Sequence, residues 1–165
     1  MTPIRVTPPA GPVVDLHVLK EHLRVVGNHD DSVIEALERA CVAHLDGWRG
    51  VLGRCIQQQS WRVDYPGAGR WRLPLPDVTQ VTATNGGGDP IDAVLGSDSL
   101  GSYVEIGEAA TVTLTAALPA DALPAVEVAI KIWVQARYDG AEGGAKAAAD
   151  NAFAALTNPL RWVRV

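Results

Sequence analysis

The stretch that decides the fold is Asp30–Arg54, DDSVIEALERACVAHLDGWRGVLGR. Its apolar residues recur at steps of three and four, which places them on one face of a helix that packs against a core. Charged residues take the other face, and an acidic or serine side chain at the start can cap the first turn. The spacing predicts a helix over residues 30–54, weakened past Trp48 where glycine is frequent. Its predicted core residues are Ile34, Leu37, Cys41, Leu45 and Trp48.

Length and composition indicate one domain, or one domain with an extension. The chain has 165 residues, of which 47% are hydrophobic, and this is enough for a core. The sequence contains no run of 18 apolar residues, so we expect no transmembrane span. The first 14 residues contain four prolines and lack the apolar centre of a signal peptide, so we expect a cytoplasmic protein. The net charge of −5 argues against broad nucleic-acid binding.

Two further helices are predicted to pack with the first. Residues 15–26 carry leucines at helical spacing after Asp15, and a glycine turn follows them. Residues 122–138 carry another apolar stripe, with Pro124 suited to a first helical turn. Residues 1–14 are rich in proline and are expected to form an extended N-terminal arm. The predicted core residues of the third helix are Val126, Ile130 and Trp133.

The period of the sequence changes at Cys55. From there to residue 116, short segments rich in β-branched residues alternate with glycine, proline and asparagine turns. This pattern predicts an inserted antiparallel sheet of about five or six strands. The predicted fold class is therefore α+β: a small bundle of about three core helices plus a C-terminal helix, with a β insertion over residues 55–116. Residues 15–140 form the predicted core.

No group of residues points to catalysis or to a cofactor. There is no nucleophile beside a base and no phosphate-binding loop, so we expect no enzyme and no cofactor. His17 and Glu21 lie one helical turn apart, but a surface charge pair explains them better than a metal site. Cys41 and Cys55 are expected to stay unlinked because a continuous helix would hold them far apart.

Arginine and tryptophan interleave in the predicted sheet. Stacking on nucleic acid is one interpretation, and cross-strand cation–π packing within a hairpin is the favoured one. With Tyr65, the tryptophans also support an alternative function, a small ligand- or carbohydrate-binding β module that uses exposed aromatic rings. The residues concerned are Arg54, Arg62, Arg70, Arg72, Trp61 and Trp71.

The end of the chain is apolar and basic. A glycine-rich break at residues 139–146 precedes a helical segment, 145–156, and then Leu160, Trp162 and Val163. A lone terminal turn cannot bury these side chains, so they either fold back on this domain or dock on a partner. Tryptophan and arginine are favoured interface anchors. Residues 141–165 are therefore predicted to form a break followed by a docking segment.

Three stretches of the sequence resemble successive motifs of one known protein family. Leu19–Val25 with its leucine-arginine pair, followed by an acidic pair, looks like the opening of that family. Gly53–Ile56 and Gln59–Trp61 are similar to its exit into the sheet. Leu118-Pro119 followed by residues 125–138 looks like its proline-led helix. In their order and spacing, these stretches resemble the head–tail connector (adaptor, head-completion) proteins of long-tailed phages and gene transfer agents, and the resemblance covers roughly residues 15–140, most of the chain.

The resemblance implies a non-enzymatic structural protein of the virion type. Its subunits would form a dodecameric ring that connects the portal to the tail, with DNA passing through the lumen without sequence-specific binding. Its partners would be the portal, a tail-side connector or stopper, and other copies of itself, and it would bind no membrane. It would be cytoplasmic during assembly and then lie at the head–tail junction of a phage-like particle. The predicted portal-docking residues are Leu156, Leu160, Arg161, Trp162, Val163 and Arg164.

Overall fold

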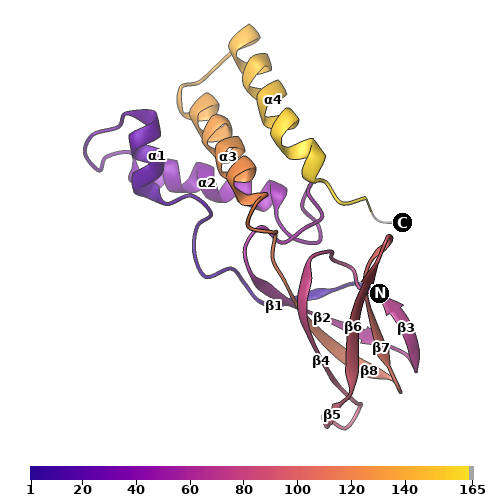
Figure 1. Ribbon diagram of the computed structural model, residues 1–165. Helices are drawn as coiled ribbons and strands as arrows, with labels where there is room; N and C mark the ends of the chain where they lie inside the picture. The colour runs from indigo at the N-terminus through magenta and orange to yellow at the C-terminus, as the bar shows by residue number, and fades with distance from the viewer. Residues whose placement is uncertain (164–165) are drawn as a thin grey trace.

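Helices gather at one end of the molecule and strands at the other (Figure 1). The computed structural model describes residues 1–163. Within them, no helix is both long and apolar enough to cross a membrane. The predicted α+β class is confirmed. The helices are α1 (Leu16–Leu23), α2 (Asp31–Leu45), α3 (Leu123–Tyr138) and α4 (Gly143–Thr157), followed by the short 3₁₀ helix η1 (Asn158–Leu160).

The β insertion, together with one strand of the N-terminal arm, forms two antiparallel sheets, whereas the sequence predicted one. The larger sheet has the order β1-β2-β8-β4-β5 and the smaller one β3-β7-β6. Alternate residues of β7 and β8 are buried, so the chain places a core between the sheets. The strands are β1 (Ile4–Thr7), β2 (Gln59–Tyr65), β3 (Gly69–Arg72), β4 (Val78–Thr84), β5 (Pro90–Ile91), β6 (Ala93–Asp98), β7 (Gly101–Ile106) and β8 (Ala110–Ala116).

The second core lies among the helices. Five of the residues expected there are fully buried, namely Ile34, Cys41, Leu45, Val126 and Ile130. Leu37 and Trp133 are partly buried and pack against the same cluster. Trp48 instead packs against the core of the sheets, because the helix that should have carried it has already ended.

The helix predicted over residues 30–54 ends nine residues early, at Leu45. The Asp46 backbone is extended, and its carboxylate accepts hydrogen bonds from the Ile56 N–H at 2.8 Å and from the Gln59 side chain at 2.9 Å. Gly47 has φ +79°, a left-handed conformation in which glycine avoids a Cβ penalty. Asp46 therefore ties the loop after α2 to the start of β2. The helix predicted over 15–26 also ends early, with Arg24 left-handed at φ 58°.

The N-terminal arm joins both halves of the molecule. Its residues 4–7 pair with β2 as an edge strand, with Arg5 opposite Trp61. Closer to α1, the Val13 N–H donates to the buried carboxylate of Glu38 at 2.9 Å, and the Val14 N–H does so at 3.4 Å. The arm is thus an added strand and a clamp on α2, which its proline content alone did not indicate.

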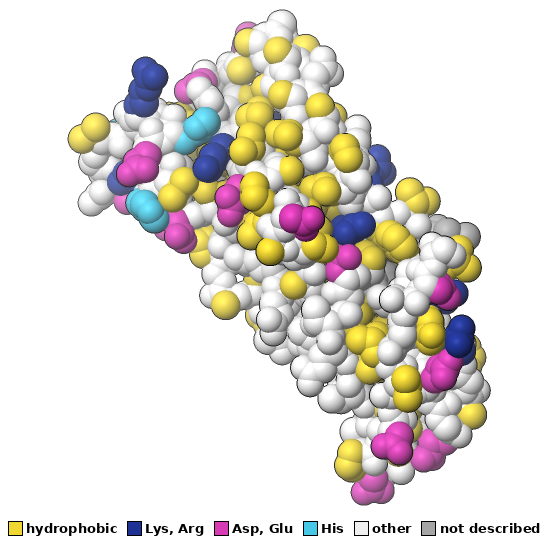
Figure 2. Space-filling view, viewed as in Figure 1, with side chains coloured by type: hydrophobic (Ala, Val, Ile, Leu, Met, Phe, Trp, Pro, Cys, Tyr) yellow, Lys and Arg dark blue, Asp and Glu magenta, His cyan; other side chains and the backbone are white. Residues whose placement is uncertain are grey.

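Helices α3 and α4 form an antiparallel hairpin (Figure 1). The predicted break is shorter than expected, because Gly143 already begins α4 and only residues 139–142 connect the two helices. Phe153 and Leu160 pack against the helical core, and Arg137 approaches Asp150 at 3.9 Å. Figure 2 shows hydrophobic side chains gathered over these two helices.

Candidate functional site

The C-terminal segment, residues 156–163, runs from the helices to the smaller sheet. Leu156 is half-buried in α4, and Thr157 is buried, with its hydroxyl donating to the Phe153 carbonyl at 2.9 Å. Leu160 in η1 packs against the helical core. The chain then becomes extended at Arg161 and reaches the β6–β7 turn. The sequence left open whether the segment folds back on its own domain or docks on a partner. In this structure the segment folds back on its own domain.

Trp162 lies in a site that we call the Trp162 seat, formed by the Leu52 carbonyl, Gly101 and Arg54. The Trp162 N–H donates to the Leu52 carbonyl at 2.8 Å. A Cβ at Gly101 would lie 2.7 Å from Cζ2 of the indole, so only glycine lets the ring approach this closely. The Arg54 guanidinium lies 5.9 Å from the ring centroid, within cation–π range.

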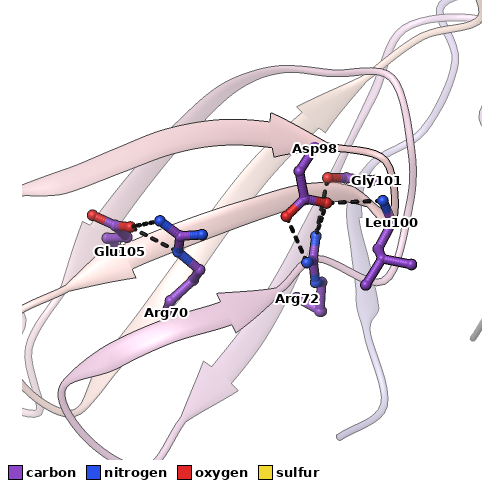
Figure 3. A network of polar contacts seen from close by, with 6 residues as sticks. All are labelled: Arg70, Arg72, Asp98, Leu100, Gly101 and Glu105. Atoms are coloured by element: carbon purple, nitrogen blue, oxygen red, sulfur yellow. Dashed lines mark hydrogen bonds and ion pairs between the residues drawn. The ribbon is translucent and has the colours of Figure 1, made fainter.

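The β6–β7 turn that carries Gly101 is held by a charged network (Figure 3). Arg72 donates from Nη1 and Nη2 to the two carboxylate oxygens of Asp98, each at 2.6 Å. Asp98 also accepts the Leu100 N–H at 2.8 Å, and Arg72 reaches the Gly101 carbonyl at 3.2 Å. The hydrogen bonds from Arg72 and then from the Leu100 amide lower the pKa of Asp98. The network fixes the turn on which the indole rests.

Arg54, the cation of the seat, is held by an ion pair. Its guanidinium pairs with Asp77 at 2.8 Å, and both side chains are largely buried. Burial raises the pKa of Asp77, and Arg54 acts in the opposite direction. The Arg54 Nε is buried and has no hydrogen-bond partner within residues 1–163. Arg54 therefore belongs to the seat and to the junction of α2 with β4.

Two of the other predicted docking residues are exposed. Arg161 is exposed and Val163 is 75% exposed. A shallow cavity of about 370 Å³ lies beside them, lined by Gly50, Val51, Gly53, Arg161, Trp162 and Val163. Arg164, also a predicted docking residue, lies outside the described residues. The segment thus has a bound part, Leu160 and Trp162, and a free part, Arg161 and Val163.

The aromatic residues expected to stack on a ligand are mostly buried. Trp61 is 8% exposed and Tyr65 is 4% exposed, and both belong to the core of the sheets. Trp71 is partly buried and donates its indole N–H to the Gly67 carbonyl at 2.9 Å. The exposed rings that the β-module alternative required are therefore missing at Trp61 and Tyr65.

The arginines of the sheet contact a different ring from those expected. Arg70 and Arg72 approach Tyr103 at 4.1 Å and 5.7 Å from its centroid. Arg70 also pairs with Glu105 at 2.7 Å (Figure 3). Cross-strand cation–π packing is thus present, but it joins β3 to β7, which pair in the sheet without forming a hairpin, and Tyr103 of β7 provides the ring. The Arg and Trp spacing along β2 and β3 did not identify this partner.

An apolar groove of about 830 Å³ lies between the arm, α1, α2 and Trp61. Its floor includes Leu19 and Val14, and Arg5, Arg39 and Arg49 also line it. The sequence does not indicate this groove, because the groove exists only where the arm pairs with β2 and passes over α2.

Titratable groups that could do chemistry are dispersed or inert. Within residues 1–163, no three His, Cys, Asp or Glu side chains are grouped as a metal site would require. His17 is exposed. Cys41 and Cys55 are free and buried, and burial raises the pKa of each thiol to about 12. Both thiols therefore remain protonated at neutral pH and are poor nucleophiles.

Solved structures share this fold along the whole chain. No protein-family model and no curated protein matches the sequence. A chain from the neck of an empty gene transfer agent particle, computed with C6 symmetry, aligns with a TM-score of 0.72 at 20% identity, covering 100% of this chain and 97% of that one. A chain from the virion of a native gene transfer agent particle aligns with a TM-score of 0.67 at 21% identity and the same coverage. The predicted resemblance to head–tail connector proteins is therefore confirmed at the level of the fold.

Proposed function

We propose that this chain is a structural, non-enzymatic subunit of the neck of a phage-like particle, the adaptor that joins the portal to the tail. The observation that supports this most directly is the whole-chain likeness to a chain of a gene transfer agent neck. The likeness includes the helices, both sheets and the C-terminal segment, since the full length is covered. The three sequence stretches that resemble head–tail connectors support the same role.

The subunits assemble into a ring, for which we propose twelve copies. Twelve is compatible with sixfold symmetry, the symmetry of the similar neck structure. In a ring, each subunit contacts its two neighbours through two different surfaces, and every subunit uses the same pair of surfaces. These head-to-tail contacts form a closed ring when the rotation between neighbours adds up to a full turn. DNA passes through the lumen, and the net charge of −5 disfavours tight binding to its phosphates.

The C-terminal segment binds the portal. Its exposed part offers a cation and an aliphatic group, Arg161 and Val163, beside the indole of Trp162. Tryptophan and arginine are frequent hot-spot residues at interfaces. A tail-side connector then binds the opposite side of the ring. In this proposal, the chain is cytoplasmic until it joins the particle.

The test is the mass of the complex between the purified chain and its portal. The full-length chain is expected to bind with about one copy per portal subunit. A chain that lacks residues 158–165 keeps α4 but is expected to lose the complex. The control is Val26→Ser, which changes an apolar side chain that is 87% exposed and lies far along the chain from the segment. Undiminished portal binding by the truncated chain would refute the docking assignment.

A further inference from the structure

We propose that the Trp162 seat is a latch that holds the C-terminal segment on its own chain and competes with the portal for Trp162. The inference rests on the proposed function and adds the regulation of the docking segment. In the free subunit the latch is closed, and portal binding requires that it open. The seat is therefore a control on when the adaptor binds.

The seat holds the segment through both backbone and side chain. The Trp162 N–H is bonded to Leu52, and the indole lies against Gly101 with Arg54 within cation–π range. The ring surface that faces Gly101 is unavailable to any other protein while these contacts last. A portal surface that binds the indole must therefore displace it from the seat.

The latch is weak enough to open. It consists of one backbone hydrogen bond, a half-buried ring and a cation 5.9 Å from the centroid. A cavity of about 370 Å³ adjoins the ring, so the seat is incompletely packed. Contacts of this kind favour the closed segment over the open one by roughly tenfold. Closed and open segments then exchange without unfolding of the domain.

The exposed part of the segment gives the portal a place to begin. Arg161 and Val163 flank the indole and point into solvent while the latch is closed. An initial contact with these two side chains leaves Trp162 in place, and full docking then removes it. Because only the open fraction binds fully, a tenfold preference for the closed state weakens the apparent portal affinity by roughly tenfold.

Gly101→Ala blocks the seat without altering the docking segment. Its new Cβ would lie 2.7 Å from the indole at a φ of +108°. Gly88→Ala is the matched control, because Gly88 lies in another hairpin turn with φ +88° and open space around it. Both variants place alanine at a positive φ, but only Gly101→Ala places a Cβ against the Trp162 ring. Two measurements are made on each: the rate of tryptic cleavage after Arg161, and the affinity for the portal.

Gly101→Ala is expected to be cleaved faster than the wild type and to bind the portal roughly tenfold more tightly. Gly88→Ala is expected to match the wild type in both measurements. Faster cleavage with unchanged or weaker portal affinity would overturn the latch and leave the docking role intact. Unchanged cleavage of Gly101→Ala would overturn it as well. If the full-length and truncated wild-type chains have equal portal affinity, the proposed docking fails, and the latch fails with it.

Hydrogen exchange of the Trp162 amide tests the latch without any substitution. The bond to the Leu52 carbonyl predicts slower exchange than in an unstructured peptide of the same sequence, by roughly tenfold. The exposed Val163 amide, measured in the same sample, serves as a reference close in sequence. Exchange of the Trp162 amide at the peptide rate would show that the free chain does not close the seat.

Discussion

The Tyr138 hydroxyl donates a hydrogen bond to Oδ2 of Asp30, so the last residue of α3 is bonded to the residue that precedes α2. His29 approaches the same oxygen at 3.1 Å. Asp30 therefore makes no side-chain cap on its own helix and links two helices instead. This contact closes the end of the bundle farthest from the sheets.

Tyr138→Phe tests this link between helices. The ring packing is retained and only the hydroxyl is lost, so the thermal midpoint is expected to fall by a few degrees. Differential scanning calorimetry measures it. Tyr103→Phe is the control, because Tyr103 contacts Arg70 through its ring and that contact survives the change. Equal midpoints for Tyr138→Phe and the wild type would show that the bond contributes nothing.

Glu38→Ala is expected to release the arm. Glu38 is 3% exposed and accepts the amides of Val13 and Val14, so its loss leaves two donors without a partner. The expected cost is about 2 kcal/mol in the free energy of unfolding, measured with urea. The arm should also be cleaved faster at Arg5. Glu35→Ala removes an exposed carboxylate on the same helix and should cost less than about 0.5 kcal/mol. Equal costs for the two variants would contradict the clamp.

Gly47→Ala tests the early end of α2. The substitution combines a φ of +79° with a Cβ that would lie 3.1 Å from the Trp61 ring. Gly140 has a φ of +63° and open space around it, so Gly140→Ala introduces the backbone strain without a steric clash. We expect Gly47→Ala to lower the free energy of unfolding by about 1 kcal/mol more than Gly140→Ala, since the core must shift to admit the methyl group. A smaller effect at Gly47 would mean that Trp61 moves without cost.

Stability is expected to fall at alkaline pH. Burial raises the pKa of Cys41 and Cys55 from 9.0 to about 12, and that of Tyr65 from 10.0 to about 12. Below pH 9 the folded and unfolded chains hold these protons equally, so the stabilisation is complete. As the pH rises from 9 toward 12, the unfolded chain releases protons that the folded chain retains, and the free energy of unfolding decreases. Urea midpoints measured along this range test the slope.

The cysteines can be separated from the tyrosine in that experiment. A Cys41→Ala, Cys55→Ala chain is expected to be less stable at neutral pH because two buried side chains are truncated. Its stability should nevertheless decline less steeply above pH 9, since two of the three groups no longer titrate. An unchanged slope would assign the alkaline loss to other groups.

Local periodicity predicted the helices whose ends are fixed by local chemistry. The helix predicted over 122–138 differs from α3 by one residue, because Pro124 fits its first turn and a glycine follows its end. The predicted end of α2 was wrong because the residues that end this helix contact residues that are distant in sequence. Asp46 is drawn to Ile56 and Gln59, and Gly47 faces Trp61. The periodicity of the sequence does not predict these long-range contacts.

The composition of the C-terminal segment predicted that its apolar side chains make contacts, but it did not predict which residues Trp162 contacts. The sequence predicts that Trp162 either folds back on this domain or docks on a partner. The residues that receive it, Leu52 and Gly101, are far apart in sequence and become neighbours only when the sheets form. The pairing of β1 with β2 was missed for the same reason, because Ile4 and Arg62 meet only in the folded sheet.

The early end of α2 has a consequence for how this protein can evolve. In a helix that continued to Arg54, Leu52 would lie roughly 10 Å along the axis from Leu45. Because the helix stops at Leu45, the loop turns back, the Leu52 amide donates to the Leu45 carbonyl at 3.1 Å, and the Leu52 carbonyl accepts the Trp162 N–H. A lineage that replaced Gly47 and Gly50 with good helix formers would gain helical turns and lose its hold on the C-terminus. The glycines of this loop are thus coupled, through the path of the backbone, to a residue more than a hundred positions away.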